Sequence, residues 1–185
     1  LQDAKKGVIF ESFPPILHLQ LKRFEYDFQR DQNIKINDRY EYPLEIDLEP
    51  YLDEKADRSE PHIYKLHGVL VHSGDVHGGH YFVHIKPSVD GRWLRFDDDR
   101  VVPITDTEVL EDNFGGESLL PNGQAHPPPS KPAMKPGALK RFTNAYMLVY
   151  IRESKAAAVL EPISTEQVPE HLRASLCRVV GVLGC

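Results

Sequence analysis

Residues 71–85, VHSGDVHGGHYFVHI, contain four of the nine histidines of the chain together with one aspartate and three glycines. Imidazole side chains bind metal ions and transfer protons near neutral pH. Three interpretations of this stretch therefore compete: a metal site, a proton-transfer site, or ordinary strand residues beside a glycine turn.

The metal interpretation has enough ligands but lacks their spacing. The available ligands are His72, His77, His80 and His84, with Asp75 and the aspartates of 97–99. On a strand, His80 and His84 share a face but lie about 13 Å apart, which is too far for joint coordination. No paired CxxC or HExxH pattern is present. We therefore predict no metal ion and no cofactor.

His80 is the histidine best placed for proton transfer. It follows Gly78 and Gly79 directly, and a glycine pair lets a backbone or a substrate approach closely. One ring nitrogen can move a proton if a carboxylate holds the other, and Asp97 is the candidate carboxylate. The remaining histidines are interpreted as strand or turn residues: His72, His77 and His84.

A hairpin must return Asp97 towards His80. The VDG sequence at 89–91 is a turn signal between predicted strands at 80–87 and 92–104. Paired residue numbers then sum to about 179. This register places His80 near Asp98 or Asp99, with Asp97 one or two positions away.

The elements around this hairpin follow from hydrophobic periodicity and from turn signals. Alternating residues predict strands at 14–24, 63–74 and 144–154, and the segment 63–104 is predicted as an antiparallel meander. The polar segments 25–39 and 51–62 are predicted as loops, the first with a short extended piece at 34–36. Thr105 and Glu108 form a capping-box pattern that opens a short helix ending at 115–116. Two further short helices are predicted at 155–162 and 168–180.

Composition limits the class of protein and its partners. The chain has 185 residues, 41% hydrophobic content and a net charge of −6, which suit one domain or part of one. Phosphate binding needs a basic excess, and no apolar run approaches a membrane span. We therefore expect neither a nucleic-acid nor a membrane partner. The two cysteines, Cys177 and Cys185, are too few for a disulfide scaffold and fit a reducing compartment.

Five segments, taken in order, resemble the ubiquitin-specific protease family, and within it the herpesvirus-associated branch. They are GVIFESFPPILHLQLKRFEYD, DQNIKINDRYEYP, LHGVLVHSGDVHGGHYFVHIKP, RWLRFDDDRV and NAYMLVYIRES. The resemblance assigns 1–155 to the C-terminal part of the family's catalytic domain. Within it, 118–140 holds six of the 15 prolines and is predicted as a mobile insertion. Residues 156–185 would be a short helical tail or linker.

The resemblance implies an α+β fold, the mainly antiparallel palm of a papain-like cysteine protease. It implies hydrolysis of the isopeptide bond after the C-terminal glycine of ubiquitin, with ubiquitin and ubiquitinated proteins as partners in the nucleus and cytoplasm. His80 would be the general base and Asp97 its orienting partner, with Asp98 as the fallback. The residues expected to bind the ubiquitin tail are Phe24, Asp75, Gly78, Gly79 and Tyr81.

The chain departs from the family pattern at the nucleophile. The family cysteine lies upstream in a glycine-rich Cys box, but no cysteine precedes His80 here. Cys177 and Cys185 lie outside the matched segments. We therefore expect an incomplete palm without thumb and Cys box, and an inactive isolated chain. The alternative is a non-catalytic ubiquitin-binding fragment or pseudoenzyme.

Overall fold

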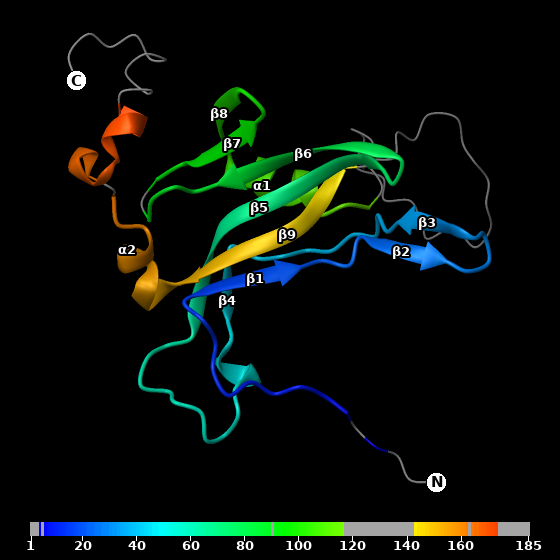
Figure 1. Cartoon of the computed structure of the whole chain (residues 1–185). Coiled ribbons are helices and arrows are strands. Elements are labelled where there is room, and N and C mark those ends of the chain that lie inside the picture. Colours follow the sequence, from blue (N-terminus) through cyan, green and yellow to red (C-terminus); the bar gives the residue numbers. More distant parts are fainter. Residues whose placement is uncertain (1–3, 5, 90, 117–142, 163, 174–185) are drawn as a thin grey trace.

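The computed structural model describes residues 4, 6–89, 91–116, 143–162 and 164–173 (Figure 1). Within these residues, seven strands form one antiparallel sheet in the order β1-β9-β5-β6-β7-β8, with β4 paired to β5. The strands are β1 (Ile16–Gln20), β4 (Glu45–Asp47), β5 (Ile63–Asp75), β6 (Gly78–Ile85), β7 (Trp93–Asp97), β8 (Arg100–Ile104) and β9 (Thr143–Arg152). β2 (Phe24–Asp27) and β3 (Gln32–Lys35) form a separate two-stranded hairpin.

The centre of the sheet is the long pair β5 and β9, as the predicted strands at 63–74 and 144–154 require. Side chains of both strands enter the core, with Val69, Val71 and Leu148 almost completely buried. β1 has the predicted period of two, because Leu17 and Leu19 are half-buried while His18 between them is exposed. β1 pairs with β9 from Ile16↔Ile151 onwards. The predicted meander is confirmed by the ladders from β5 through β7.

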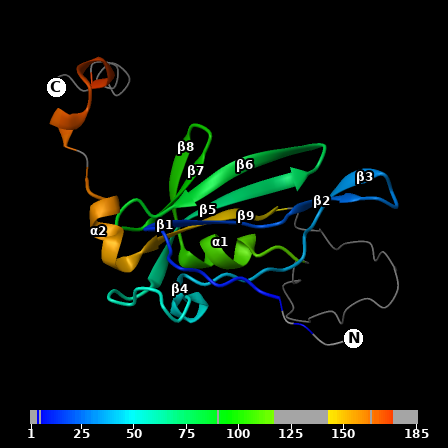
Figure 2. The ribbon, with the colours of Figure 1, turned by 60° about the horizontal axis from the view of Figure 1, so that its bottom comes forward.

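One short helical segment covers a face of this sheet (Figure 2). α1 (Asp106–Leu110) begins with the predicted capping box: the Thr105 hydroxyl accepts from the Glu108 amide, and the Glu108 carboxylate accepts from the Thr105 amide. The segment continues as the 3-10 turn η2 (Glu111–Asn113). Its fully buried Val109 anchors the segment to the core.

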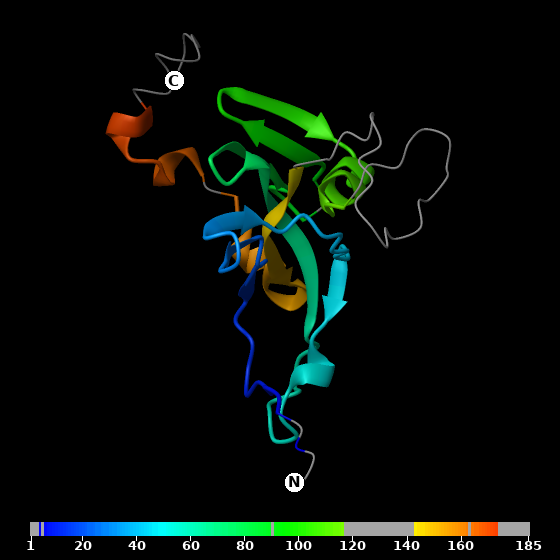
Figure 3. The same cartoon turned by 90° about the vertical axis from the view of Figure 1, so that its right-hand side faces the viewer.

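Two predicted elements differ from the structure. The segment 25–39 was expected to be mainly loop, but it contains the β2–β3 hairpin, and the extended piece predicted at 34–36 is only the end of β3. Residues 92–104 were expected to be a single broken strand, but they form the β7–β8 hairpin. Asp98 turns this hairpin with a φ of 52°, a left-handed conformation that aspartate tolerates better than most side chains. Figures 1 and 3 show the hairpin at the opposite end of the molecule from the segment that leads into β1.

The remaining turns are short. They are η1 (Glu49–Tyr51), η3 (Glu153–Lys155), α2 (Ala156–Val159) and η4 (Thr165–Gln167). α2 ends before Pro162, as predicted for 155–162. Of the helix predicted at 168–180, residues 170–173 are helical and the rest lie outside the described residues, as does the insertion 118–140. None of the helices in the described part of the chain has the length and apolar character needed to cross a membrane. The division of the chain at 155 stays a prediction.

Candidate active site

The β5–β6 hairpin positions His80. Its ladder pairs Ser73 with His80 and Asp75 with Gly78, so β6 begins two residues earlier than predicted and only Val76 and His77 form the turn. β6 then pairs with β7 in the predicted register, from Val83↔Phe96 to Ile85↔Leu94. The ladder stops before it reaches His80, which leaves the side chains of His80 and Asp97 room to meet.

His80 and Asp97 are hydrogen-bonded. Their Nε2 and Oδ1 atoms lie 2.5 Å apart. Because Nε2 faces a carboxylate, it carries a proton and donates it, and Nδ1 is left as the nitrogen that can accept a proton. No hydrogen bond joins His80 to the fallback Asp98 within the described residues. The geometry therefore favours Asp97 as the orienting carboxylate.

The charges around this pair favour a protonated imidazole. The hydrogen bond that His80 donates to Asp97 raises the pKa of His80, the charges of Asp97 and Asp98 add to the rise, and Arg95 opposes it. The pKa of Asp97 is lowered, first by its hydrogen bond with His80 and then by Arg95. An imidazolium is therefore easier to form here than on an isolated histidine, which suits a base that must carry a proton between two steps.

The same residues are the candidate metal ligands. Among the described residues, one atom each from His80, Asp97 and Asp98 forms a group within 4.8 Å. That group includes no second histidine of the 71–85 stretch. The Asp97 carboxylate also binds the cationic Arg95, at 2.5 Å from Nη2 to Oδ2. The guanidinium charge therefore opposes a divalent cation at this position.

Two of the predicted tail-binding residues meet in one aromatic cluster, formed by Phe24, His72, Tyr81 and Tyr146. The ring of His72 lies 5.4 Å from that of Phe24 and 4.6 Å from that of Tyr81, measured between centroids. Tyr146 lies 6.1 Å from Phe24 and 6.0 Å from Tyr81. Tyr81 is exposed, so the cluster has an open side.

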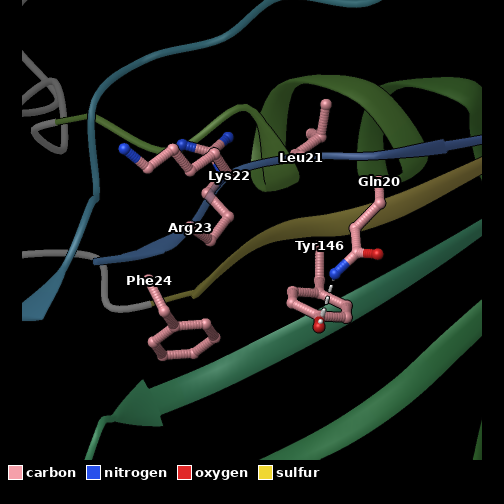
Figure 4. Close-up of a pocket in the computed structure, with 6 residues that line it drawn as sticks. All are labelled: Gln20, Leu21, Lys22, Arg23, Phe24 and Tyr146. Carbon is pink, nitrogen blue, oxygen red and sulfur yellow. Dashed lines mark hydrogen bonds between the residues drawn. The ribbon is translucent and has the colours of Figure 1, made fainter. Parts of the chain in front are cut away.

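A hollow of about 330 Å³ adjoins the cluster and is lined by Phe24 and Tyr146. Figure 4 shows Phe24, Tyr146 and Gln20 pointing to one side of the chain, while Lys22 points away. The Gln20 side-chain amide donates a hydrogen bond to the Tyr146 hydroxyl at 3.0 Å, next to the hollow. Lys22 and Arg23 also line this hollow, so its wall is partly apolar and partly polar.

Comparisons with known proteins identify the family of this chain. The family model described as Ubiquitin carboxyl-terminal hydrolase matches residues 2–150. The chain belongs to the ubiquitin carboxyl-terminal hydrolase family. Ubiquitin carboxyl-terminal hydrolase 15 of Schizosaccharomyces pombe is 59% identical over 176 residues, which are 95% of this chain and 15% of that protein. Ubiquitin C-terminal hydrolase 12 of Arabidopsis thaliana is 51% identical over 183 residues, 95% of this chain and 16% of that protein.

A solved structure of the yeast SAGA DUBm is similar at a TM-score of 0.50 and 29% identity, covering 76% of this chain and 25% of that one. The family match and this likeness confirm the predicted α+β fold, a papain-like palm that is mainly antiparallel sheet. The chain spans about 15% of the length of the first curated relatives that it matches.

Lys35 and His72 also belong to this candidate site, although residue spacing in the sequence does not indicate it. The sequence predicts an ordinary strand residue at His72, but in the structure this side chain is 4% exposed and lies at the centre of the aromatic cluster. Its pairing with Tyr81 across the β5–β6 hairpin is the signal that points to this role. Lys35 lies 2.9 Å from His72 Nδ1 and donates to the His72 and Gly74 carbonyls. Burial lowers the pKa of Lys35 to about 8. These contacts fasten the β2–β3 hairpin to the end of β5.

The three remaining tail-binding candidates lie around the β5–β6 turn. Asp75 accepts a hydrogen bond from the Val76 amide at 2.7 Å, so its carboxylate supports the turn. Gly78 has open space where a side chain would start, with no atom within 4 Å. Gly79 has no room for a side chain, because a Cβ there would overlap the His72 ring and lie 2.8 Å from the Ser73 carbonyl oxygen.

Replacing Gly79 by alanine is therefore expected to destabilise the folded chain by about 2 kcal/mol, because the buried His72 must move. Gly78→Ala is the matched control one residue away, and we expect a change within about 0.5 kcal/mol. Urea unfolding of both variants measures the difference. Equal losses would show that backbone freedom, and not the contact with His72, makes these glycines necessary.

Proposed function

We propose that this chain contributes the base and its orienting carboxylate to a cysteine-type deubiquitinase, which hydrolyses the isopeptide bond after the C-terminal glycine of ubiquitin. The observation that carries the proposal is the hydrogen bond of 2.5 Å between His80 Nε2 and Asp97 Oδ1, in a member of this hydrolase family. Its partners are then ubiquitin and ubiquitinated proteins. The same proposal includes membership of the herpesvirus-associated branch and a location in nucleus and cytoplasm.

In each half of this reaction His80 accepts one proton and donates one proton. Nδ1 takes the proton of the attacking thiol, and the sulfur forms a bond to the carbonyl carbon while the isopeptide C–N bond breaks. The leaving lysine amine receives the proton from the imidazolium. A water molecule then gives one proton to Nδ1 and attacks the thioester carbonyl carbon, and the C–S bond breaks. The imidazolium returns its proton to the departing thiolate, and the released C-terminal carboxyl group of ubiquitin loses its own proton to solvent. Asp97 holds Nε2–H throughout, fixes the tautomer and stabilises the imidazolium.

The ubiquitin tail is proposed to pass along the aromatic cluster and over the β5–β6 hairpin. Phe24 and Tyr81 would wall this path. Open space beside Gly78 supports close passage of a chain that ends in two glycines. Gly79 contributes indirectly, because it leaves the room that His72 occupies. Asp75 would attract a basic residue of the tail.

The nucleophile is proposed to come from an upstream Cys box, because no cysteine of this sequence precedes His80. The palm would be completed by the thumb that carries this box. Cys177 and Cys185 lie outside the described residues and outside the family match. The second candidate function rests on the same absence: a non-catalytic ubiquitin-binding fragment or pseudoenzyme.

A fluorogenic ubiquitin substrate tests these alternatives. We expect no turnover above buffer with this chain alone, and turnover with a longer protein that includes an upstream Cys box. A longer protein that binds ubiquitin without turnover would favour the pseudoenzyme. Turnover by this chain that disappears in Cys177→Ala would contradict the proposed source of the nucleophile. Loss of turnover with a chelator would favour a metal-dependent hydrolase.

A further inference from the structure

Arg95 binds the side of Asp97 that faces away from His80. It precedes Asp97 by two residues on β7, so the two side chains share one face of the sheet. Arg95 Nε and Nη2 donate to Asp97 Oδ2 at 3.1 and 2.5 Å, while Oδ1 accepts from His80 Nε2 at 2.5 Å. Each carboxylate oxygen therefore has its own cationic or proton-donating partner.

Arg95 is itself fixed by packing. Its guanidinium carbon lies 3.9 Å from the centre of the Phe82 ring, and Phe82 is 7% exposed. A guanidinium that stacks on a buried ring and donates through two nitrogens has little freedom left. Phe82 belongs to the same face of β6 as His80 and lies two residues from it. The order of contacts is thus Phe82, Arg95, Asp97 and His80.

We propose that Arg95 is a positioning residue that holds the Asp97 carboxylate in the orientation in which it accepts the hydrogen bond of His80. The catalytic consequence of this inference rests on the proposed function. The effect of Arg95 on the orientation of Asp97 does not depend on that function. Asp97 needs such an anchor because it is the last residue of β7 and is followed by the left-handed Asp98. A partly exposed aspartate at a strand end otherwise rotates between several rotamers.

A positioning role and a purely electrostatic role predict opposite results. The charged groups acting on the His80 imidazole are Asp97 and Asp98, which favour its protonation, and Arg95, which opposes it. If Arg95 acted only through its charge, its removal would raise the pKa of His80. If it orients Asp97, its removal weakens the hydrogen bond that is the largest cause of the raised pKa, and the pKa of His80 falls.

The test is an NMR titration of the His80 imidazole in this chain, which needs no turnover. We expect Arg95→Met to lower the pKa of His80 by about half a unit and Arg95→Lys to restore part of the loss. In an Asp97→Ala background, Arg95→Met should no longer lower the pKa, because the anchored group is gone. Arg100→Met is the matched control: it removes the same charge from β8, from the residue paired with Asp97.

The positioning role would be overturned if Arg95→Met raised the pKa of His80 or left it unchanged. It would also be overturned if Arg95→Met lowered this pKa equally with and without Asp97. In the longer protein, Arg95→Met should lower kcat roughly tenfold and leave KM for the ubiquitin substrate almost unchanged. A longer protein that never hydrolyses ubiquitin would contradict the proposed function, while the titration would still decide the role of Arg95.

Discussion

His80→Ala, introduced into the longer protein with its Cys box, is expected to lower kcat/KM by about three orders of magnitude while ubiquitin binding survives. The thiol then has no base in reach, and the leaving amine has no acid. Fluorogenic hydrolysis gives the loss of turnover, and titration with labelled ubiquitin gives the affinity.

Asp97→Ala is expected to cost less than His80→Ala, because the imidazole remains and loses only its held orientation. The double variant should be little worse than His80→Ala alone, because the two residues share one role. Additive losses would contradict a joint role. A larger loss in Asp98→Ala than in Asp97→Ala would transfer the orienting role to Asp98.

His77→Ala serves as the control for this series. His77 lies in the exposed turn between β5 and β6, in the same histidine-rich stretch. His84 is not a suitable control, although the sequence predicts an ordinary strand residue there. Its side chain is 3% exposed, so replacing it by alanine would leave a cavity. If His77→Ala abolished turnover and His80→Ala spared it, the assignment of the base would be wrong.

Lowering the pH from about 6.5 to about 4 is expected to destabilise the chain by on the order of 3 kcal/mol through His84 alone. Burial, with a smaller effect of the Arg95 charge, lowers the pKa of His84 to about 4. Its ring lies 5.3 Å from that of Phe82, and its Nε2 has no hydrogen-bond partner among the described residues. The amide nitrogen of the Asn113 side chain lies 3.5 Å from His84 Nδ1.

The direction of this stability change follows from which state of the chain, folded or unfolded, binds the His84 proton more readily. Unfolded His84 is protonated below about pH 6.5, but the folded chain takes this proton only near pH 4. Between these values the unfolded state binds more protons, so stability falls as the pH falls, and the loss is complete below pH 4. Urea unfolding across this pH range should show that the stability of His84→Gln falls less steeply with falling pH than the stability of the wild type. An equally steep decline of stability in His84→Gln and in the wild type would contradict the prediction.

The sequence predicted the parts of the fold that have a simple period or a marked turn. Alternation located β1, β5 and β9, and the VDG turn gave the register that aligns Val83 with Phe96. That register brought Asp97 within reach of His80 but left direct contact open. The contact depends on how the two side chains extend beyond the last paired residues, which residue spacing does not determine.

The missed features depend on partners that are distant in sequence or on unusual backbone. The β2–β3 hairpin is polar, and Lys35 at its end is fastened to His72 on β5. The β7–β8 turn has no glycine, because Asp98 adopts the left-handed conformation itself. Arg95 reads in sequence as an ordinary charged strand residue, and only its place between Phe82 and Asp97 gives it a function.

The strand order also has a consequence for synthesis on the ribosome. β9 lies in the middle of the sheet, between β1 and β5, although it is the last of the seven strands to be translated. Until it emerges, β1 and one edge of β5 have no partner, and such open edges attract other chains. Contacts between segments so far apart in sequence also form slowly. A nascent or truncated polypeptide that ends before Thr143 therefore leaves open the edges of β1 and β5 that β9 covers in this structure, and such exposed edges are recognised by chaperones and proteases.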